Sequence, residues 1–184
     1  MEAQQIEANR ECGRVGMGST MGRGDGRSWT DSNLDVQGYC LTAEDSRALR
    51  WGLRFPTALC LVFVVTGLVL QSAVLIFALV PIGAIAGWTR RHPFDLLWNH
   101  GLRHLTGSPQ LPPNPRPRRH AFKLATVWLL AVGLLFAFGQ ATAALILGAV
   151  MVAVCGLLTT ANYCIPSTLL GIWWRRTGTE PAPT

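Results

Sequence analysis

The sequence predicts an all-α membrane protein with four transmembrane helices arranged as two helical hairpins. Two stretches, residues 55–88 and 124–174, contain no Asp, Glu, Lys, Arg or His. Such stretches are typical of membrane-spanning segments, because a charged side chain is costly inside a bilayer. A continuous helix of about 34 residues would measure about 50 Å, whereas the hydrocarbon core measures about 30 Å. Each stretch is therefore expected to fold back once.

Polar interruptions predict where each stretch turns. Gln71 and Ser72 interrupt the first stretch, and Gly139 and Gln140 interrupt the second. Each pair combines a small residue with an amide that can turn the backbone and reach the headgroup water. The expected spans are residues 55–70, 72–88, 122–138 and 141–161, within a membrane domain of residues 41–174. Because the first two spans are at the lower limit of length for crossing a bilayer, a pair of re-entrant hairpins is the structural alternative.

The N-terminal arm, residues 1–40, is polar and rich in glycine, without the apolar run of a cleavable signal peptide. Because the arm lacks periodicity, we expect it to be disordered. Beyond it, Thr42 can cap a short amphipathic helix that leads into the bilayer, with Asp45 in the capping-box position. Residues 175–184 are expected to form a short tail.

The connection between the hairpins is expected to have two parts. Residues 93–105 predict a short interfacial helix, because apolar side chains recur on one helical face. That face comprises Phe94, Leu97, Trp98, Leu102 and Leu105. Residues 106–119 contain five prolines and end in a basic cluster, which favours an extended, lipid-facing spacer.

The distribution of charge predicts the orientation of the helices. The formal net charge is +6, but residues 1–50 carry eight acidic residues against six arginines, so ten basic residues lie beyond them. All ten flank the same end of the expected helices, and the positive-inside rule assigns that end and both termini to the cytoplasm. We therefore expect a multi-pass protein of the cell inner (plasma) membrane. The residues expected to face anionic lipid headgroups or a soluble partner are Arg90, Arg91, Arg116, Arg118, Arg119 and Lys123. Nucleic acid is not an expected partner.

Small residues within the spans predict close helix packing. Gly83 and Gly87 form a Gly-x-x-x-Gly pair, which can serve packing or a homo-oligomer, and Pro81 is expected to kink the second span. A hydrophobic ligand in a groove at Pro81 is the alternative use. Because the spans carry no carboxylate, imidazole or cation, the sequence argues against a coupled transporter.

A metal site has only weak support in the sequence. His100 and His104 are spaced i, i+4 and could bind one ion, with His92, Asp95 or His120 as a third ligand. No cysteine accompanies them, and no His-Glu-x-x-His motif is present. We therefore expect polar side chains at a wet interface, and neither a metal nor a cofactor.

The cysteines do not predict a disulfide framework. They are Cys12, Cys40, Cys60, Cys155 and Cys164, without a Cys-x-x-Cys pair, and cytoplasmic thiols stay reduced. Cys60 and Cys155 lie inside expected spans and can act as small hydrophobes. Cys155 and Cys164 are nine residues apart, on opposite faces of one helix, so they are not expected to pair.

Cys164 is the candidate functional thiol. It lies where the fourth span is expected to reach the cytoplasmic boundary, and Pro166 is expected to end that helix. Carbonyls left free at a helix end are negative and disfavour a thiolate, so only Arg175, Arg176 or a folded-over basic loop could activate it. Packing is the alternative role.

Three motifs carry a resemblance to a known family: His92-Pro93-Phe94-Asp95, the RPRRHAFKLA segment from Arg116 to Ala125, and Cys164-Ile165-Pro166-Ser167. With the order of hairpins and spacer, they resemble a bacterial integral membrane family, the domain of unknown function 4395, over residues 50–174. The family name implies no activity. Some members of that family are encoded near thioredoxin-like and sulfurtransferase proteins. The resemblance therefore implies that this protein has a place in thiol or sulfur metabolism. Some relatives have a second cysteine close to the last one, and this chain has none.

Two functions remain open. The first is a non-enzymatic scaffold or partner subunit whose helices associate through small residues. The second is a membrane thiol protein that relays sulfur or electrons through Cys164 to a thioredoxin-like or sulfurtransferase partner. Cys164→Ser is tolerated under the first and abolishes function under the second. Passive transport of a small neutral compound through an oligomer is a third possibility.

Overall fold

The computed structural model describes residues 34, 37, 39, 41, 43–161 and 163–177 of the 184-residue chain. Within these residues every regular element is helical, so the all-α prediction is confirmed. The long helices are α3 (Ala43–Val69), α4 (Ala73–Trp88), α7 (Arg116–Ala137) and α8 (Ala141–Ala161). The shorter elements are α5 (Pro93–Leu97), the π-helical turn η1 (Trp98–Leu102), α6 (Arg103–Thr106) and α9 (Ile165–Thr177). The predicted disordered arm lies outside the described residues except at its last few positions, as do Cys12 and Cys40.

Three helical segments are long and apolar enough to cross a membrane: Glu44–Val69, Arg116–Ala137 and Ala141–Ala161. Helix α4 has only 16 residues. It passes the same test together with the Pro93–Thr106 segment, from which it is bent by 84°. The described chain thus has three or four candidate spans, and the arrangement as two membrane hairpins stays a prediction.

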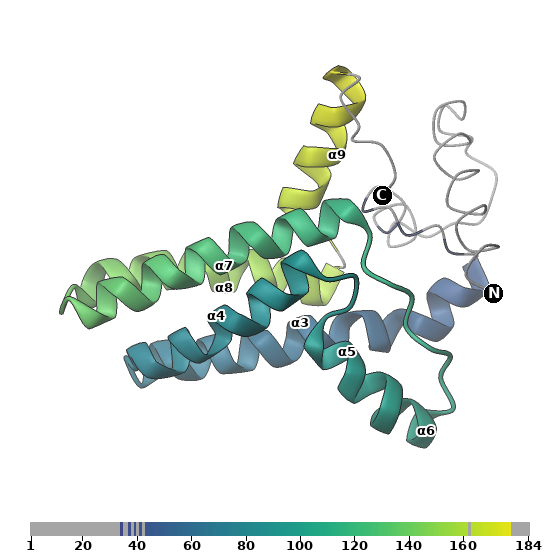
Figure 1. Ribbon diagram of the computed structural model, residues 1–184, viewed down its shortest axis with the longest axis horizontal. Helices are drawn as coiled ribbons and strands as arrows, with labels where there is room; N and C mark the ends of the chain where they lie inside the picture. The colour runs from purple at the N-terminus through teal and green to yellow at the C-terminus, as the bar shows by residue number, and fades with distance from the viewer. Residues whose placement is uncertain are drawn as a thin grey trace.

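Two tight connections reverse the chain at the same end of the bundle (Figure 1). Between α3 and α4, Gln71 adopts a φ of 47°, and the Ser72 hydroxyl accepts a bond from the Leu75 amide to cap α4. Between α7 and α8, Gly139 adopts a φ of 73°. Glycine suits this left-handed conformation because it has no Cβ to clash with the backbone.

The core of the bundle lies where α4 packs along α7 and α3 along α8. Its buried residues are Val64, Leu68, Ile76, Leu79, Leu129, Val132, Ala144 and Met151. The glycine pair of α4 faces α7: a Cβ at Gly83 would lie 2.6 Å from Thr126 Oγ1, and a Cβ at Gly87 would lie 2.8 Å from Lys123 Cγ. These glycines therefore permit close packing within one chain.

The helices begin earlier than the sequence suggested. Helix α3 is continuous from Ala43, so the predicted lead and the first span form one helix with Pro56 inside it. Helix α7 begins at Arg116, six residues before the predicted span, because Pro117 suits the first turn of a helix. The basic cluster that was assigned to the spacer consequently lies on α7.

The segment expected to form an interfacial helix packs on the bundle through Trp98, a residue of the predicted apolar face, and leaves other residues of that face exposed. Trp98 is buried together with the polar Asp95 and Asn99, whereas Leu97 is 53% exposed and Leu105 is 85% exposed. A π-helical turn over Trp98–Leu102 interrupts the α-helical geometry of this segment. The spacer also differs from the lipid-facing expectation, since Leu111 and Asn114 are buried.

The close approach of α4 and α7 predicts that Gly87→Val lowers the free energy of unfolding by about 1–3 kcal/mol. The added Cβ would meet Lys123 in both its side chain and its backbone amide. Gly156→Val is the matched control, because a Cβ at Gly156 meets nothing within 4 Å. Chemical unfolding in detergent micelles measures both, and equal stabilities of the two variants would contradict the packing.

Candidate functional site

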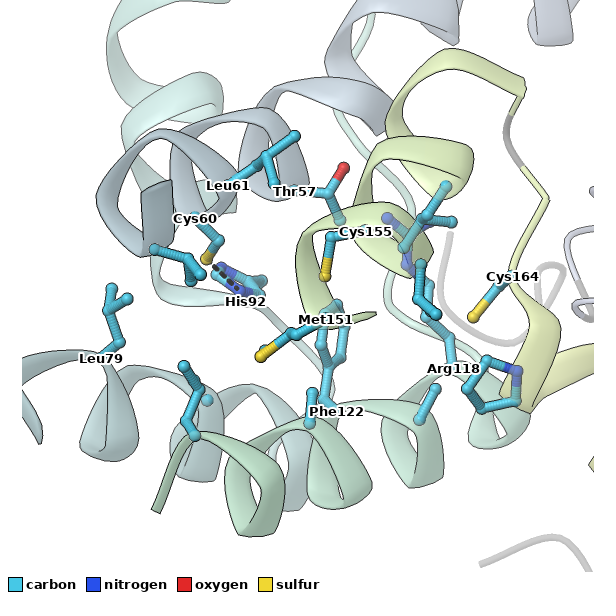
Figure 2. Close-up of a pocket in the computed structure, with 18 residues that line it drawn as sticks. Thr57, Cys60, Leu61, Leu79, His92, Arg118, Phe122, Met151, Cys155 and Cys164 are labelled. Carbon is cyan, nitrogen blue, oxygen red and sulfur yellow. Dashed lines mark hydrogen bonds between the residues drawn. The ribbon is translucent and has the colours of Figure 1, made fainter. Parts of the chain in front are cut away.

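A cavity of about 100 Å³ lies between α3, α4, α7, α8 and the start of α9. Its wall is apolar except for a few side chains that carry sulfur, nitrogen or a hydroxyl. These are Thr57, Cys60, His92, Arg118, Met151, Cys155 and Cys164. Figure 2 shows Cys60 and His92 toward one side of the cavity, Cys164 and Arg118 toward the other, and Cys155 between them. The fold thus brings three cysteines from separate parts of the chain to one space.

Cys164 is the residue directly before α9. Its carbonyl accepts the Thr168 amide at 2.9 Å, and its sulfur accepts the Ser167 hydroxyl at 3.0 Å. Cys164 is 4% exposed and Ser167 is completely buried. The sulfur therefore lies at the positive end of a helix, with a hydroxyl donor within hydrogen-bonding distance.

This geometry corrects two expectations about Cys164. Pro166 does not end the fourth span: α8 ends at Ala161, and Pro166 lies in the first turn of a new helix. A helix N-terminus favours a thiolate, whereas the free carbonyls that were expected would disfavour it. The break between α8 and α9 also directs Cys155 and Cys164 to the same cavity instead of opposite faces. The side chains of Arg175 and Arg176 lie outside the described residues.

Cys60 lies opposite a neutral histidine. His92 Nδ1 accepts the Phe94 amide at 3.1 Å, which assigns the ring proton to Nε2, and Nε2 lies 3.8 Å from Cys60 Sγ. Burial lowers the pKa of His92 to about 4, and the charge of Arg118 acts in the same direction. At neutral pH the ring is therefore uncharged and donates its Nε2 proton to the Cys60 sulfur.

Arg118 is the cation of this site. The sequence placed it among the residues that face lipid or a partner, but it is only 4% exposed. Its Nη1 donates to the Tyr39 hydroxyl at 3.0 Å and its Nη2 to the Leu53 carbonyl at 3.1 Å. The guanidinium also lies 5.3 Å from the Tyr39 ring centre and 5.8 Å from that of Phe122. Since these two aromatic rings cover Arg118, it is withdrawn from the surface.

A buried network connects Arg118 to a carboxyl group. The Tyr39 hydroxyl donates to Asn114 Oδ1 at 2.8 Å, and Asn114 Nδ2 donates to Asp95 Oδ2 at 3.2 Å. The same carboxylate oxygen accepts the His92 amide at 2.8 Å. Burial raises the pKa of Tyr39 to about 12 and raises that of Asp95, although the His92 amide and Arg118 oppose the latter shift. We call Tyr39, Asp95, Asn114 and Arg118 the Arg118 network.

The other predicted basic residues lie at the surface or are partly buried. Arg90 and Arg91 are exposed beyond the end of α4. Arg119 Nη2 donates to the Trp88 carbonyl at 3.3 Å, and Lys123 Nζ lies 5.1 Å from the centre of the Trp88 ring. Arg116, in the first turn of α7, is partly buried. These residues border the junction of α4 and α7.

Among the described residues, no third ligand joins His100 and His104 to form a metal site. His100 and His104 are exposed, and His100 Nδ1 lies 3.0 Å from the Leu96 carbonyl. Within the described ranges no three His, Cys, Asp or Glu side chains come together as ligands. Pro81, where a groove for a hydrophobic ligand was the alternative expectation, is exposed and does not line the cavity.

The roles of Cys60, His92 and Arg118 were missed by sequence reasoning. In the sequence Cys60 is one apolar residue among many. Its contact with His92 joins residues 32 positions apart, which no local pattern predicts. A signal was available for His92 and Asp95, because a side-chain acceptor followed three residues later by an acid is a capping pattern. Nothing local distinguishes Arg118 from its arginine neighbours.

The buried neutral state of His92 predicts a pH dependence of stability. In the unfolded chain His92 binds a proton near pH 6.5, whereas the folded chain binds it only near pH 4. Stability should therefore fall as the pH falls through this window, by about 3 kcal/mol in total. His92→Asn keeps an acceptor for the Phe94 amide but does not titrate, so its stability should fall less. Burial raises the pKa of Asp95, which makes the folded chain more stable as the pH falls. This opposite contribution is the same in both proteins, so it cancels when their pH profiles are compared.

Unfolding in detergent between pH 4 and 7 measures this difference. Identical pH profiles for the wild type and His92→Asn would contradict the buried neutral imidazole.

Comparison with known proteins identifies the family. The model of a family described as Domain of unknown function (DUF4395) matches residues 50–175. The matched range contains the cavity, its three cysteines and Arg118. No curated protein and no solved structure matches the chain. The match spans well over half of the sequence, so the resemblance is confirmed and the chain belongs to the family of the domain of unknown function DUF4395.

Proposed function

We propose that this protein is a membrane thiol protein whose Cys164 exchanges sulfur or electrons with a thiol partner. The observation that carries the proposal is the setting of the Cys164 sulfur at the N-terminus of α9, bonded to the Ser167 hydroxyl. Both features stabilise an anionic sulfur, and the thiolate is the nucleophile in thiol exchange. Arg118, which lines the same cavity, adds a positive charge.

The exchange step needs only a partner that carries a disulfide or a persulfide. The Cys164 thiolate attacks one sulfur of the partner, a new S–S bond forms, and the other sulfur leaves as a thiolate with the electron pair. Ser167 holds the position that the second thiol has in a Cys-x-x-Cys motif. Because serine forms no disulfide, a second thiol must come from elsewhere to release the product.

Membrane placement is part of the proposal. We assign four spans, with the two tight turns on the outer side and the termini, the Arg118 network and the cavity toward the cytoplasm. Support comes from the basic residues around Trp88 and the start of α7, at the bundle end away from the turns (Figure 1). On this face, anionic lipid headgroups and a soluble thioredoxin-like or sulfurtransferase protein are the proposed partners.

Ser167→Ala tests the activation of the thiol. Loss of the hydroxyl should slow alkylation of Cys164 at neutral pH by about tenfold or more, since a hydrogen bond to a charged group contributes about 1.5–3 kcal/mol. Thr168→Val is the control, because it removes a hydroxyl from the same turn but keeps the backbone amide that donates to the Cys164 carbonyl. Iodoacetamide labelling in detergent, followed by peptide mass spectrometry, gives both rates.

Cys164→Ser tests the function itself. Exchange with a thioredoxin-like disulfide or a protein persulfide should be lost, whereas Cys60→Ser should retain it. If Cys164→Ser retains exchange, or if Cys164 is alkylated no faster than Cys155, the thiol proposal fails. The scaffold or partner-subunit function is then the account that remains.

A further inference from the structure

The size of the cavity limits what can reach Cys164. The thiol is 4% exposed, and the space in front of it measures about 100 Å³. An apolar cavity of about 150 Å³ in another protein accommodates benzene, so this space holds about four non-hydrogen atoms. The space beside the sulfur therefore favours a sulfur donor of a few atoms over a molecule as large as glutathione.

The charge of the cavity is the second constraint. The two terminal nitrogens of Arg118 are bonded to neutral groups, Tyr39 and the Leu53 carbonyl. Its Nε is buried and has no hydrogen-bond partner in the described part of the chain. Asp95 reaches Arg118 only through Tyr39 and Asn114. A buried cation without a contacting anion is costly, so a cavity with Arg118 in its wall is suited to an anionic ligand.

We propose that the cavity holds a single-sulfur anion, the terminal sulfur of a persulfide on Cys164, with Arg118 as its counter-ion. This inference rests on the proposed thiol function and names its substrate class as small sulfane sulfur, supplied as inorganic polysulfide. Cys155 and Met151 give the anion a soft, apolar surrounding.

The chemistry balances without an added oxidant. With hydrogen disulfide as the smallest donor, the Cys164 thiolate attacks one sulfur, the S–S bond of the donor breaks, and hydrosulfide leaves with the electron pair. The sulfur that remains on Cys164 gives its proton to water and becomes the anion beside Arg118. Attack by a thiolate of an acceptor protein on this terminal sulfur removes it and restores the Cys164 thiolate.

The experiment exposes the purified full-length protein in detergent either to inorganic tetrasulfide or to glutathione disulfide. Peptide mass spectrometry then reads the state of each cysteine. The expected result is the mass of one added sulfur on Cys164 with tetrasulfide, and no glutathione adduct at that position. A glutathione adduct that forms as readily as the persulfide would overturn the size argument.

Two variants probe the site itself. Ala125→Leu fills the cavity without changing a thiol or a charge, and it should reduce the persulfide on Cys164 about tenfold. Ala137→Leu is the matched control, because Ala137 lies exposed at the end of α7, and it should behave as the wild type. Arg118→Gln, where it folds, should shorten the lifetime of the persulfide by a similar factor.

The outcomes separate the two proposals. If Cys164 reacts readily with iodoacetamide but gains no sulfur from tetrasulfide, the persulfide site is wrong and the thiol function stands. If Cys164 is inert to both reagents, the thiol function fails and this inference fails with it. Persulfide loading of Ala125→Leu at the wild-type level would also contradict the site.

Discussion

The buried guanidinium of Arg118 is the interaction on which the rest of this structure depends. It connects Tyr39, the Leu53 carbonyl in α3 and the first turns of α7, three segments that are remote in sequence. A buried cation costs several kcal/mol unless its donors are satisfied, so these partners must be placed accurately. Asn114 and Asp95 extend the same network to the segment that follows α4. The end of the bundle is therefore organised around one charge.

The candidate site is a consequence of that network. Asp95 accepts the His92 amide, which fixes the ring of His92 against Cys60, and Arg118 itself forms part of the cavity wall. The break before α9 then adds Cys164 on the other side. Arg118 and His92 therefore belong both to the buried hydrogen-bond network and to the cavity wall. This double role explains why an otherwise apolar cavity contains a cation and an imidazole.

Much of the fold could be predicted from the sequence, because the charge-free stretches and the turns at Gln71 and Gly139 are local signals. The site could not be predicted in the same way. Arg118 lies within a run of basic residues, and only the aromatic rings that fold over it decide which arginine is buried. Pro166 is compatible with the end of one helix or the start of the next, and the two alternatives give Cys164 opposite electrostatic surroundings.

The most direct test of the account is the native state of the three cavity thiols. The protein would be purified from its own membrane under conditions that trap thiols, and mass spectrometry would compare Cys164 with Cys60 and Cys155. The account predicts a persulfide or a mixed disulfide at Cys164 alone. An unmodified Cys164, in the same reduced state as the other two cysteines, would contradict it and would leave a structural thiol in a packed helix junction.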